Sequence, residues 1–284
     1  MSLSSTLPLL AVEEPEVHLH PQSEKAAIKE LMSLPGQSFI TTHSVAIAEE
    51  VPPDLITVLR RSGNNIRAAT IPYEDPASPG KSYLDVGDND LLLRQLKTGG
   101  AQILFARCAV LCEGQTESGA LPVFARALGI DVNLMGITVF SVGGTGYRPL
   151  LRSLHKDAFG VPWVLLSDGE KQTLQRIGKY LAEAGYVTEK EVKEAQTKGQ
   201  LVKKVLEPNN CFVNPSGQNF EQAIFAAGGR ASYEKIEKAY PGASKPLLGR
   251  LVAEEITLGG TNASKIPPAI VVALRRAEQL SRER

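Results

Sequence analysis

The chain has few cysteines, and their spacing does not suggest disulfide pairing. Its 284 residues include Cys108, Cys112 and Cys211, with no Cys-x-x-C pair and no even number for a disulfide framework. This pattern excludes a disulfide-stapled secreted domain and is typical of a reduced, cytoplasmic protein. Cys108 and Cys112 stand in an apolar run, where we expect them to act as small buried hydrophobic residues.

Net charge and membrane-spanning segments are also absent. The 31 Lys and Arg residues balance 31 Asp and Glu residues, so a nucleic-acid partner would have to be held by local basic patches or by metal ions. No stretch has the uncharged length that spans a bilayer and no signal peptide is visible, so no membrane partner is expected. The 43 % of hydrophobic residues is ample for the cores of two ordinary domains.

The order of apolar and polar residues predicts two α/β units. The expected strands are 7–12, 38–42, 54–61, 65–71, 108–113, 136–142, 161–167 and 211–215, and the expected helices are 22–34, 91–99, 117–128, 147–158 and 171–184. Alternation at these lengths after residue 106 predicts a parallel sheet with helices on both faces. The chain therefore divides into residues 1–72, a Pro- and Gly-rich linker at 73–105, an α/β domain at 106–225 with a helical insertion near 171–207, and a helical segment at 226–284.

Two buried strands of the second unit end in carboxylates. The run VLCEGQTE places Glu113 and Glu117 after one strand, and VLLSDGE places Asp168 and Glu170 after another. Charge at the end of a buried strand costs desolvation energy unless a partner compensates it. The partner that suits four carboxylates is a hard divalent cation with oxygen ligands, which predicts a metal-dependent phosphoryl-transfer site.

Residues 9–21, LLAVEEPEVHLHP, resemble the Walker B strand and D-loop of ABC-type ATPases of the structural-maintenance and RecF-like branch. The resemblance implies that Glu13 matches the Mg²⁺-holding residue, normally Asp, and Glu14 the base that polarises the attacking water. His43 in TTHS would be the switch histidine that reads the γ-phosphate. The alternative is a surface strand end with solvated carboxylates.

The loop that such an ATPase needs is missing. No G-x-x-x-x-G-K-[ST] segment, whose amides and lysine cradle the β- and γ-phosphates, occurs in the chain, and no LSGG-like signature precedes the Walker B strand. We therefore expect that the chain by itself neither binds nor hydrolyses ATP usefully. A strand also begins almost at once after Met1, so we expect that Met1 is not the native start and that the ATPase lobe is partial.

The carboxylates of the second unit resemble those of the Toprim domain, which has a Glu after its first strand and an Asp-x-Asp after a later one. Glu113 matches the first position and Asp168-Gly169-Glu170 the second, with Glu170 as a departure that lengthens the reach. An ABC-type head followed directly by a Toprim domain is the architecture of the OLD (overcoming lysogenisation defect) nucleases. The chain resembles their C-terminal part.

The OLD resemblance implies further site residues, namely Glu117, Glu221 in NFEQA and Lys265 in SKIPPA. It implies that two Mg²⁺ or Mn²⁺ ions held by Glu113, Glu117, Asp168, Glu170 and Glu221 clamp the scissile phosphate, with Lys265 offsetting charge in the transition state. Each assignment has a structural alternative. Glu117 suits a helix N-terminus, Glu221 suits a solvated helix face, and Lys265 suits a plain loop.

A basic stripe follows the glycine-rich segment SVGGTG. Arg148, Arg152 and Lys156 stand at i, i+4 and i+8, which places them on one face of the expected helix at 147–158. Such a stripe beside the carboxylates could follow a DNA backbone, and it is equally well a solvated helix face.

The sequence thus favours a metal-dependent DNA nuclease that nicks and degrades DNA by two-metal hydrolysis. ATP would be a cofactor only of the full-length protein, which could pair as a homodimer. A non-catalytic Toprim module for DNA docking or assembly stays open, as does another Toprim chemistry such as that of a topoisomerase. A topoisomerase needs a nucleophilic tyrosine, and no tyrosine here has a recognisable context.

Overall fold

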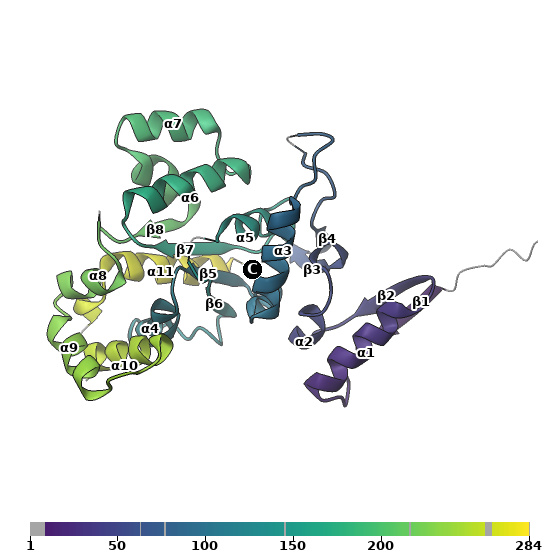
Figure 1. Ribbon diagram of the computed structural model, residues 1–284, viewed down its shortest axis with the longest axis horizontal. Coiled ribbons are helices and arrows are strands. Elements are labelled where there is room, and N and C mark those ends of the chain that lie inside the picture. The colour runs from purple at the N-terminus through teal and green to yellow at the C-terminus, as the bar shows by residue number, and fades with distance from the viewer. Residues whose placement is uncertain are drawn as a thin grey trace, which may run out of the picture.

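The N-terminal part of the chain forms two small sheets. The structure is a computed structural model that describes residues 9–62, 64–76, 78–144, 146–215, 217–258 and 263–283. The elements of this part are β1 (Leu9–Glu13), α1 (Pro21–Ser33), β2 (Gln37–Thr41), α2 (Val45–Ala48), η1 (Pro53–Leu55), β3 (Thr57–Ser62) and β4 (Asn65–Thr70). β1 and β2 pair in parallel, and β3 and β4 form the predicted antiparallel hairpin. Figure 1 shows the β1–α1–β2 unit at one end of the molecule.

The segment expected to be a linker at 73–105 is part of the fold. It contains α3 (Val86–Lys97), which Asp85 caps by accepting a hydrogen bond from the backbone N–H of Asp88, and η2 (Gly100–Phe105). Leu92, Leu96 and Ile103 are buried in the same core as the central sheet. The segment joins the two units, but its apolar residues also cover one face of that sheet.

A four-stranded parallel sheet lies at the centre of the molecule, in the order β6-β5-β7-β8. Its strands are β5 (Cys108–Cys112), β6 (Ile137–Ser141), β7 (Trp163–Ser167) and β8 (Cys211–Val213). Every residue of β5 and β7 is buried, as expected where helices cover both faces of a parallel sheet. The predicted α/β class is confirmed.

Helices cover the two faces of this sheet (Figure 1). They are α4 (Gln115–Ala127), α5 (Arg148–Ser153), α6 (Lys171–Glu183), α7 (Glu189–Thr197), η3 (Val202–Leu206), η4 (Glu207–Asn209), α8 (Phe220–Ala226), α9 (Arg230–Ala239), α10 (Lys245–Thr257), η5 (Ala263–Lys265) and α11 (Pro268–Arg282). Ala109 and Leu111 of β5 pack into one core with α3, α5 and α6, and its alternate residues pack into a second core with α4, α10 and α11. None of the described helices is both long and apolar enough to cross a membrane.

Two sequence-based expectations are settled by these elements. The three cysteines are unpaired and fully buried, which was predicted for Cys108 and Cys112 and not for Cys211. The helix expected at 147–158 was wrong in length, because α5 ends at Ser153 and the chain then turns toward β7. Lys156 therefore lies beyond the helix that carries Arg148 and Arg152.

Helix α4, which carries Glu117, is held by an unusually close approach of α10. A Cβ atom at Gly249 of α10 would lie 1.9 Å from the carbonyl oxygen of Thr116, and one at Gly119 would lie 2.0 Å from that of Pro246. Only glycine fits at such backbone-to-backbone contacts. The C-terminal helices therefore fix the turn of α4 that presents Glu117.

Candidate functional site

Glu113 and Asp168 follow the carboxyl ends of the two central strands. β5 and β7 are neighbours in register, with Cys112 opposite Leu166, so the residues that follow them emerge at the same edge of the sheet. Both side chains are half-buried, and the Oγ of Ser167 donates to Glu113 Oε2 at 3.4 Å. The structure thus brings together the two carboxylates that the sequence predicts most directly.

Glu117 joins them from the first turn of α4. Its side chain is 9 % exposed and folds back over Gly114, where an added Cβ would lie 2.5 Å from Glu117 Oε2. Burial, together with the charges of Asp168 and Glu113, raises the pKa of Glu117 to about 7, while Lys245 opposes the rise. Glu117 therefore both occupies a helix N-terminus and faces the other carboxylates.

The electrostatics of Asp168 show the same repulsion. Burial, together with the charge of Glu113, raises its pKa to about 6. The Nδ2 of Asn214 donates to Asp168 Oδ1 at 3.3 Å and partly offsets the rise, as does the backbone N–H of Phe220. These acidic groups repel one another where they are half-buried or buried, and a cation would relieve the repulsion. Its charge would lower the pKa values of Glu117 and Asp168.

A strap that includes Asn214, Pro215, Gly217 and Gln218 crosses the acidic motif at Gly169. The backbone N–H of Gly169 donates to the carbonyl oxygen of Gln218 at 2.9 Å, and that of Gly217 donates to the carbonyl oxygen of Gly169 at 2.9 Å. A Cβ at Gly169 would lie 2.2 Å from the carbonyl oxygen of Pro215. The glycine between Asp168 and Glu170 is thus required by this crossing.

The remaining predicted ligands lie at the margin of the site. Glu170 is exposed at the start of α6, and its charge reaches Asp168. Glu221 is exposed on α8, where its charge acts on Tyr233 of α9. Lys265 is half-buried in η5, and no ion pair joins it to these carboxylates within the described part of the chain.

The carboxylates fit a hydrated cation better than a closed coordination shell. Among the residues that the structure describes, no three His, Cys, Asp or Glu side chains are grouped so that they could hold one metal ion. The five-residue ligand set expected from the sequence is therefore not gathered. Mg²⁺ keeps most of its waters and needs only one or two carboxylates, which Glu113 and Asp168 offer as hard oxygen donors.

Sequence reasoning missed several polar neighbours of this site. They are Ser167, Asn214 and Lys245, described above, and Tyr147, a fully buried residue whose pKa is raised well above its usual value by burial and by the charge of Glu113. A signal existed only for Asn214, which lies near the end of the predicted strand at 211–215. Asn in that position is also common in plain turns, so the sequence did not distinguish it.

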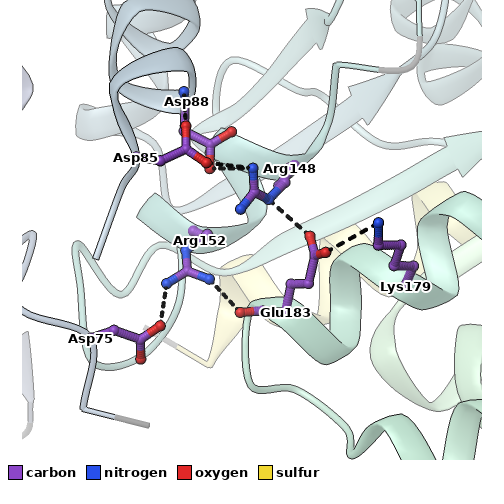
Figure 2. Close-up of polar contacts among 7 residues, drawn as sticks. All are labelled: Asp75, Asp85, Asp88, Arg148, Arg152, Lys179 and Glu183. Carbon is purple, nitrogen blue, oxygen red and sulfur yellow. Dashed lines mark hydrogen bonds and ion pairs between the residues drawn. The ribbon is translucent and has the colours of Figure 1, made fainter. Parts of the chain in front are cut away.

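The basic stripe is not an open surface, which corrects the expectation for Arg148 and Arg152. Arg148 forms ion pairs with Asp85 at 2.9 Å, Asp88 at 3.1 Å and Glu183 at 2.8 Å. Arg152 is 5 % exposed and pairs with Asp75 at 2.8 Å. Figure 2 shows that these contacts join the segment before α3 to α5 and α6. The two arginines hold the fold together, and Lys156 alone of the three is exposed.

The N-terminal motif forms a separate polar cluster. Glu14 has a left-handed φ of 45° and its Oε1 lies 3.4 Å from His43 Nε2. Glu16, which the sequence analysis did not select, accepts from Thr42 Oγ1 at 2.6 Å and from the backbone N–H of His43 at 2.9 Å. Glu13 is exposed at the end of β1. Glu14 and His43 are therefore brought together, and Glu13 stands apart.

A cavity of 740 Å³ adjoins this N-terminal cluster. Glu14, Thr41 and His43 line it on one side, and apolar residues of β2, β3 and η2 line the rest, among them Ile40, Val58 and Leu104. It does not reach Glu113 or Asp168 and so has no part in the carboxylate site.

Comparisons with known families match the two parts of the chain separately. Residues 104–169 match the model of the "Overcoming lysogenization defect protein-like, TOPRIM domain", and residues 3–76 match that of a protein of unknown function, DUF2813. A relative in Escherichia coli, the uncharacterized protein YbjD, is 30% identical over 164 residues, which are 58% of this chain and 28% of the relative.

Two further likenesses concern OLD proteins. The OLD nuclease of Thermus scotoductus is 24% identical over 216 residues, which are 74% of this chain and 40% of that protein. The C-terminal region of the Xanthomonas campestris OLD protein superposes with a TM-score of 0.52 at 24% identity, covering 64% of this chain and 96% of that one. The latter likeness shows the same fold. The chain spans less than half the length of either curated relative.

Proposed function

We propose that this chain, which carries the Toprim domain of the OLD family, is a DNA nuclease that hydrolyses phosphodiester bonds with Mg²⁺ or Mn²⁺. The observation that carries the proposal is the placement of Glu113 and Asp168 at the ends of adjacent buried strands, where their charges repel. Such a site gains most from a divalent cation, and Toprim relatives include a protein named as a nuclease.

The residues of the chain would act mainly by binding the cations and by keeping the carboxylates in position. Two divalent ions, when bound, supply an activated water for in-line attack and stabilise the leaving 3′ oxygen. Glu113 and Asp168 would hold these ions, and Ser167 and Asn214 would fix the two carboxylates by the hydrogen bonds described above. Glu117, Glu170 and Glu221 would add negative charge around them, and Lys265 a fixed positive charge.

ATP is not part of the proposed reaction of this chain. Glu14 and His43 offer a base and a γ-phosphate reader, but the sequence contains no phosphate-binding loop to hold the nucleotide. We propose that ATP acts only in a full-length protein that supplies this loop and pairs as a homodimer.

A non-catalytic docking module is the second candidate, and one observation favours it. No three ligand side chains are grouped for one ion within the described residues. Topoisomerase chemistry is less well supported, because Tyr147, the tyrosine whose pKa responds to Glu113, is fully buried and could not reach a phosphate.

Supercoiled plasmid tests these candidates. We expect the purified chain to nick it in Mg²⁺ or Mn²⁺ and to leave it intact in EDTA, with nicking lost in Glu113→Ala because that carboxylate holds the cation. Agarose electrophoresis separates the outcomes. Relaxed but covalently closed circles would indicate topoisomerase chemistry, and plasmid that stays supercoiled in every metal would indicate docking.

The corrected basic stripe gives a paired prediction. Arg148→Gln should lower the free energy of unfolding by about 1 kcal/mol, because it removes the cation that Asp85, Asp88 and Glu183 share. Its DNA affinity should keep the parent's salt dependence. Lys156→Gln should leave stability unchanged and reduce the slope of log affinity against log salt by about 1 if Lys156 contacts a phosphate. Urea unfolding would measure stability, and fluorescence anisotropy would measure DNA affinity. A reduced salt dependence in Arg148→Gln, with unchanged stability, would contradict the structural role of Arg148.

A further inference from the structure

Asn214 occupies the same kind of position in the sheet as the acidic residues. It follows β8 directly, as Asp168 follows β7, and β7 and β8 are parallel neighbours in register. Its backbone N–H donates to the carbonyl oxygen of Ser167 at 3.1 Å. The side chain therefore emerges at the carboxyl edge of the sheet, beside the acidic motif.

The two ends of the Asn214 amide have different surroundings. Its Nδ2 donates to Asp168 Oδ1 at 3.3 Å. The residue is 3 % exposed, yet its Oδ1 is buried and accepts no hydrogen bond from any group that the structure describes. A buried acceptor without a partner is destabilising, so its presence here calls for a donor or a cation that satisfies it.

A second buried side-chain oxygen without a hydrogen-bond partner among the described groups lies in the same strap. The side-chain Oε1 of Gln218 is also buried without a hydrogen-bond partner among the described groups, while the backbone oxygen of Gln218 accepts from Gly169. Two amide oxygens without donors thus belong to the strap that crosses Asp168-Gly169-Glu170. Amide and carboxylate oxygens are the ligands that Mg²⁺ and Mn²⁺ prefer, and Mg²⁺ retains waters that can donate to a nearby oxygen.

We propose that Asn214 is a further member of the cation site. Its Nδ2 positions the Asp168 carboxylate, and its Oδ1 accepts from a water of the hydrated cation or binds the cation itself. In both arrangements the Asn214 side chain contributes a hard oxygen atom to the cation site. The proposal rests on the proposed function, since it assumes that Asp168 holds a divalent cation.

Two substitutions separate this role from a purely structural one. Asn214→Leu keeps the branched shape and removes both polar atoms, and we expect it to weaken Mn²⁺ binding by about 10- to 100-fold. Asn214→Asp removes the donor to Asp168 but keeps an oxygen donor, and we expect it to bind Mn²⁺ at least as tightly as the parent at pH 8. If Asn214 served only to hold Asp168, both variants would bind Mn²⁺ more weakly.

The measurement is Mn²⁺ titration of the purified chain by calorimetry, with thermal unfolding in EDTA and in Mn²⁺ beside it. Asn209→Ala is the matched control, because Asn209 donates to the carbonyl oxygen of Val205 at 2.7 Å before β8 and its loss should cost stability without changing Mn²⁺ affinity. Asn214→Asp should be destabilised in EDTA and recover in Mn²⁺.

Each result decides the matter. Parent-like Mn²⁺ affinity in Asn214→Leu, or weakened affinity in Asn214→Asp, would overturn the role of Asn214 while leaving the nuclease proposal intact. If Asn214→Leu failed to fold, Asn214→Asp would still decide the question alone. A parent chain that binds no Mn²⁺ would instead overturn the metal-dependent function, and the role of Asn214 with it.

Discussion

Asp168→Asn is expected to abolish cleavage and to make the metal-free protein more stable. Removing the carboxylate removes a proposed cation ligand, and a loss of several kcal/mol of transition-state stabilisation should slow cleavage about a thousandfold or more. The stability of the metal-free protein should rise because Asn carries no negative charge, whereas burial and the charge of Glu113 disfavour the charge of Asp168. The side-chain oxygen of Asn can still accept from Asn214, so the local geometry is kept.

The stability gain should depend on pH in a defined direction. The pKa of Asp168 rises from 3.8 to about 6 on folding, so the folded state holds the proton more tightly than the unfolded chain does. The parent therefore loses stability as pH rises from 3.8 through about 6, and the loss is complete above that range. At pH 8, Asp168→Asn should gain about 1 kcal/mol after allowance for solvent screening, and at pH 3 it should gain nothing.

Thermal unfolding in EDTA at several pH values would measure this gain, which corresponds to about 2–4 °C at pH 8. Added Mg²⁺ should stabilise the parent and have much less effect on the variant. Asp90→Asn is the matched control, because Asp90 is exposed and pairs with Arg94 across one turn of α3. A variant that is less stable than the parent at pH 8 in EDTA would contradict the repulsion at this site.

The carboxylate core of the site could be predicted from the sequence for a simple physical reason. Fully apolar runs such as CAVLC and WVLLS form strands that are buried on both faces, and parallel strands bring their following residues to one edge. Glu113 and Asp168 had to meet there once β5 and β7 were neighbours. Glu117 followed because it lies one turn into the helix after β5.

The partners of each charge could not be predicted, because they come from distant parts of the chain. Arg152 pairs with Asp75, which precedes it by 77 residues, and Arg148 pairs with Asp85, which precedes it by 63. Helical spacing placed the two arginines on one face correctly but gave no information about what covers that face. The same holds for Asn214, whose contact with Asp168 depends on how the strap crosses the motif.

Gly169→Ala is expected to damage both stability and activity, although it adds only a methyl group. The new Cβ would lie 2.2 Å from the carbonyl oxygen of Pro215 and 2.5 Å from that of Asn214, so two stretches of backbone would have to separate. The hydrogen bonds that join Gly169 to Gln218 and Gly217 would lengthen or break. Overpacking of this kind and two lost hydrogen bonds together cost about 2–4 kcal/mol.

Activity should fall because the same movement displaces the neighbours of Gly169 on both sides. Asp168 and Glu170 are bonded directly to it, and a misplacement of about 1 Å at a catalytic group slows a reaction about 100-fold. Urea unfolding and plasmid nicking in Mn²⁺ would measure the two losses.

Gly87→Ala is the control, because Gly87 lies on the exposed side of α3 and its nearest neighbour, Asp85 Oδ1, lies 3.3 Å from the added Cβ. That contact is with the end of a side chain and not with backbone, so we expect Gly87→Ala to change stability by less than about 1 kcal/mol and to leave nicking unchanged. Parent-like stability and nicking in Gly169→Ala would mean that the strap moves without cost and does not fix the acidic motif. Parent-like nicking with lowered stability would mean that the positions of Asp168 and Glu170 do not matter for cleavage.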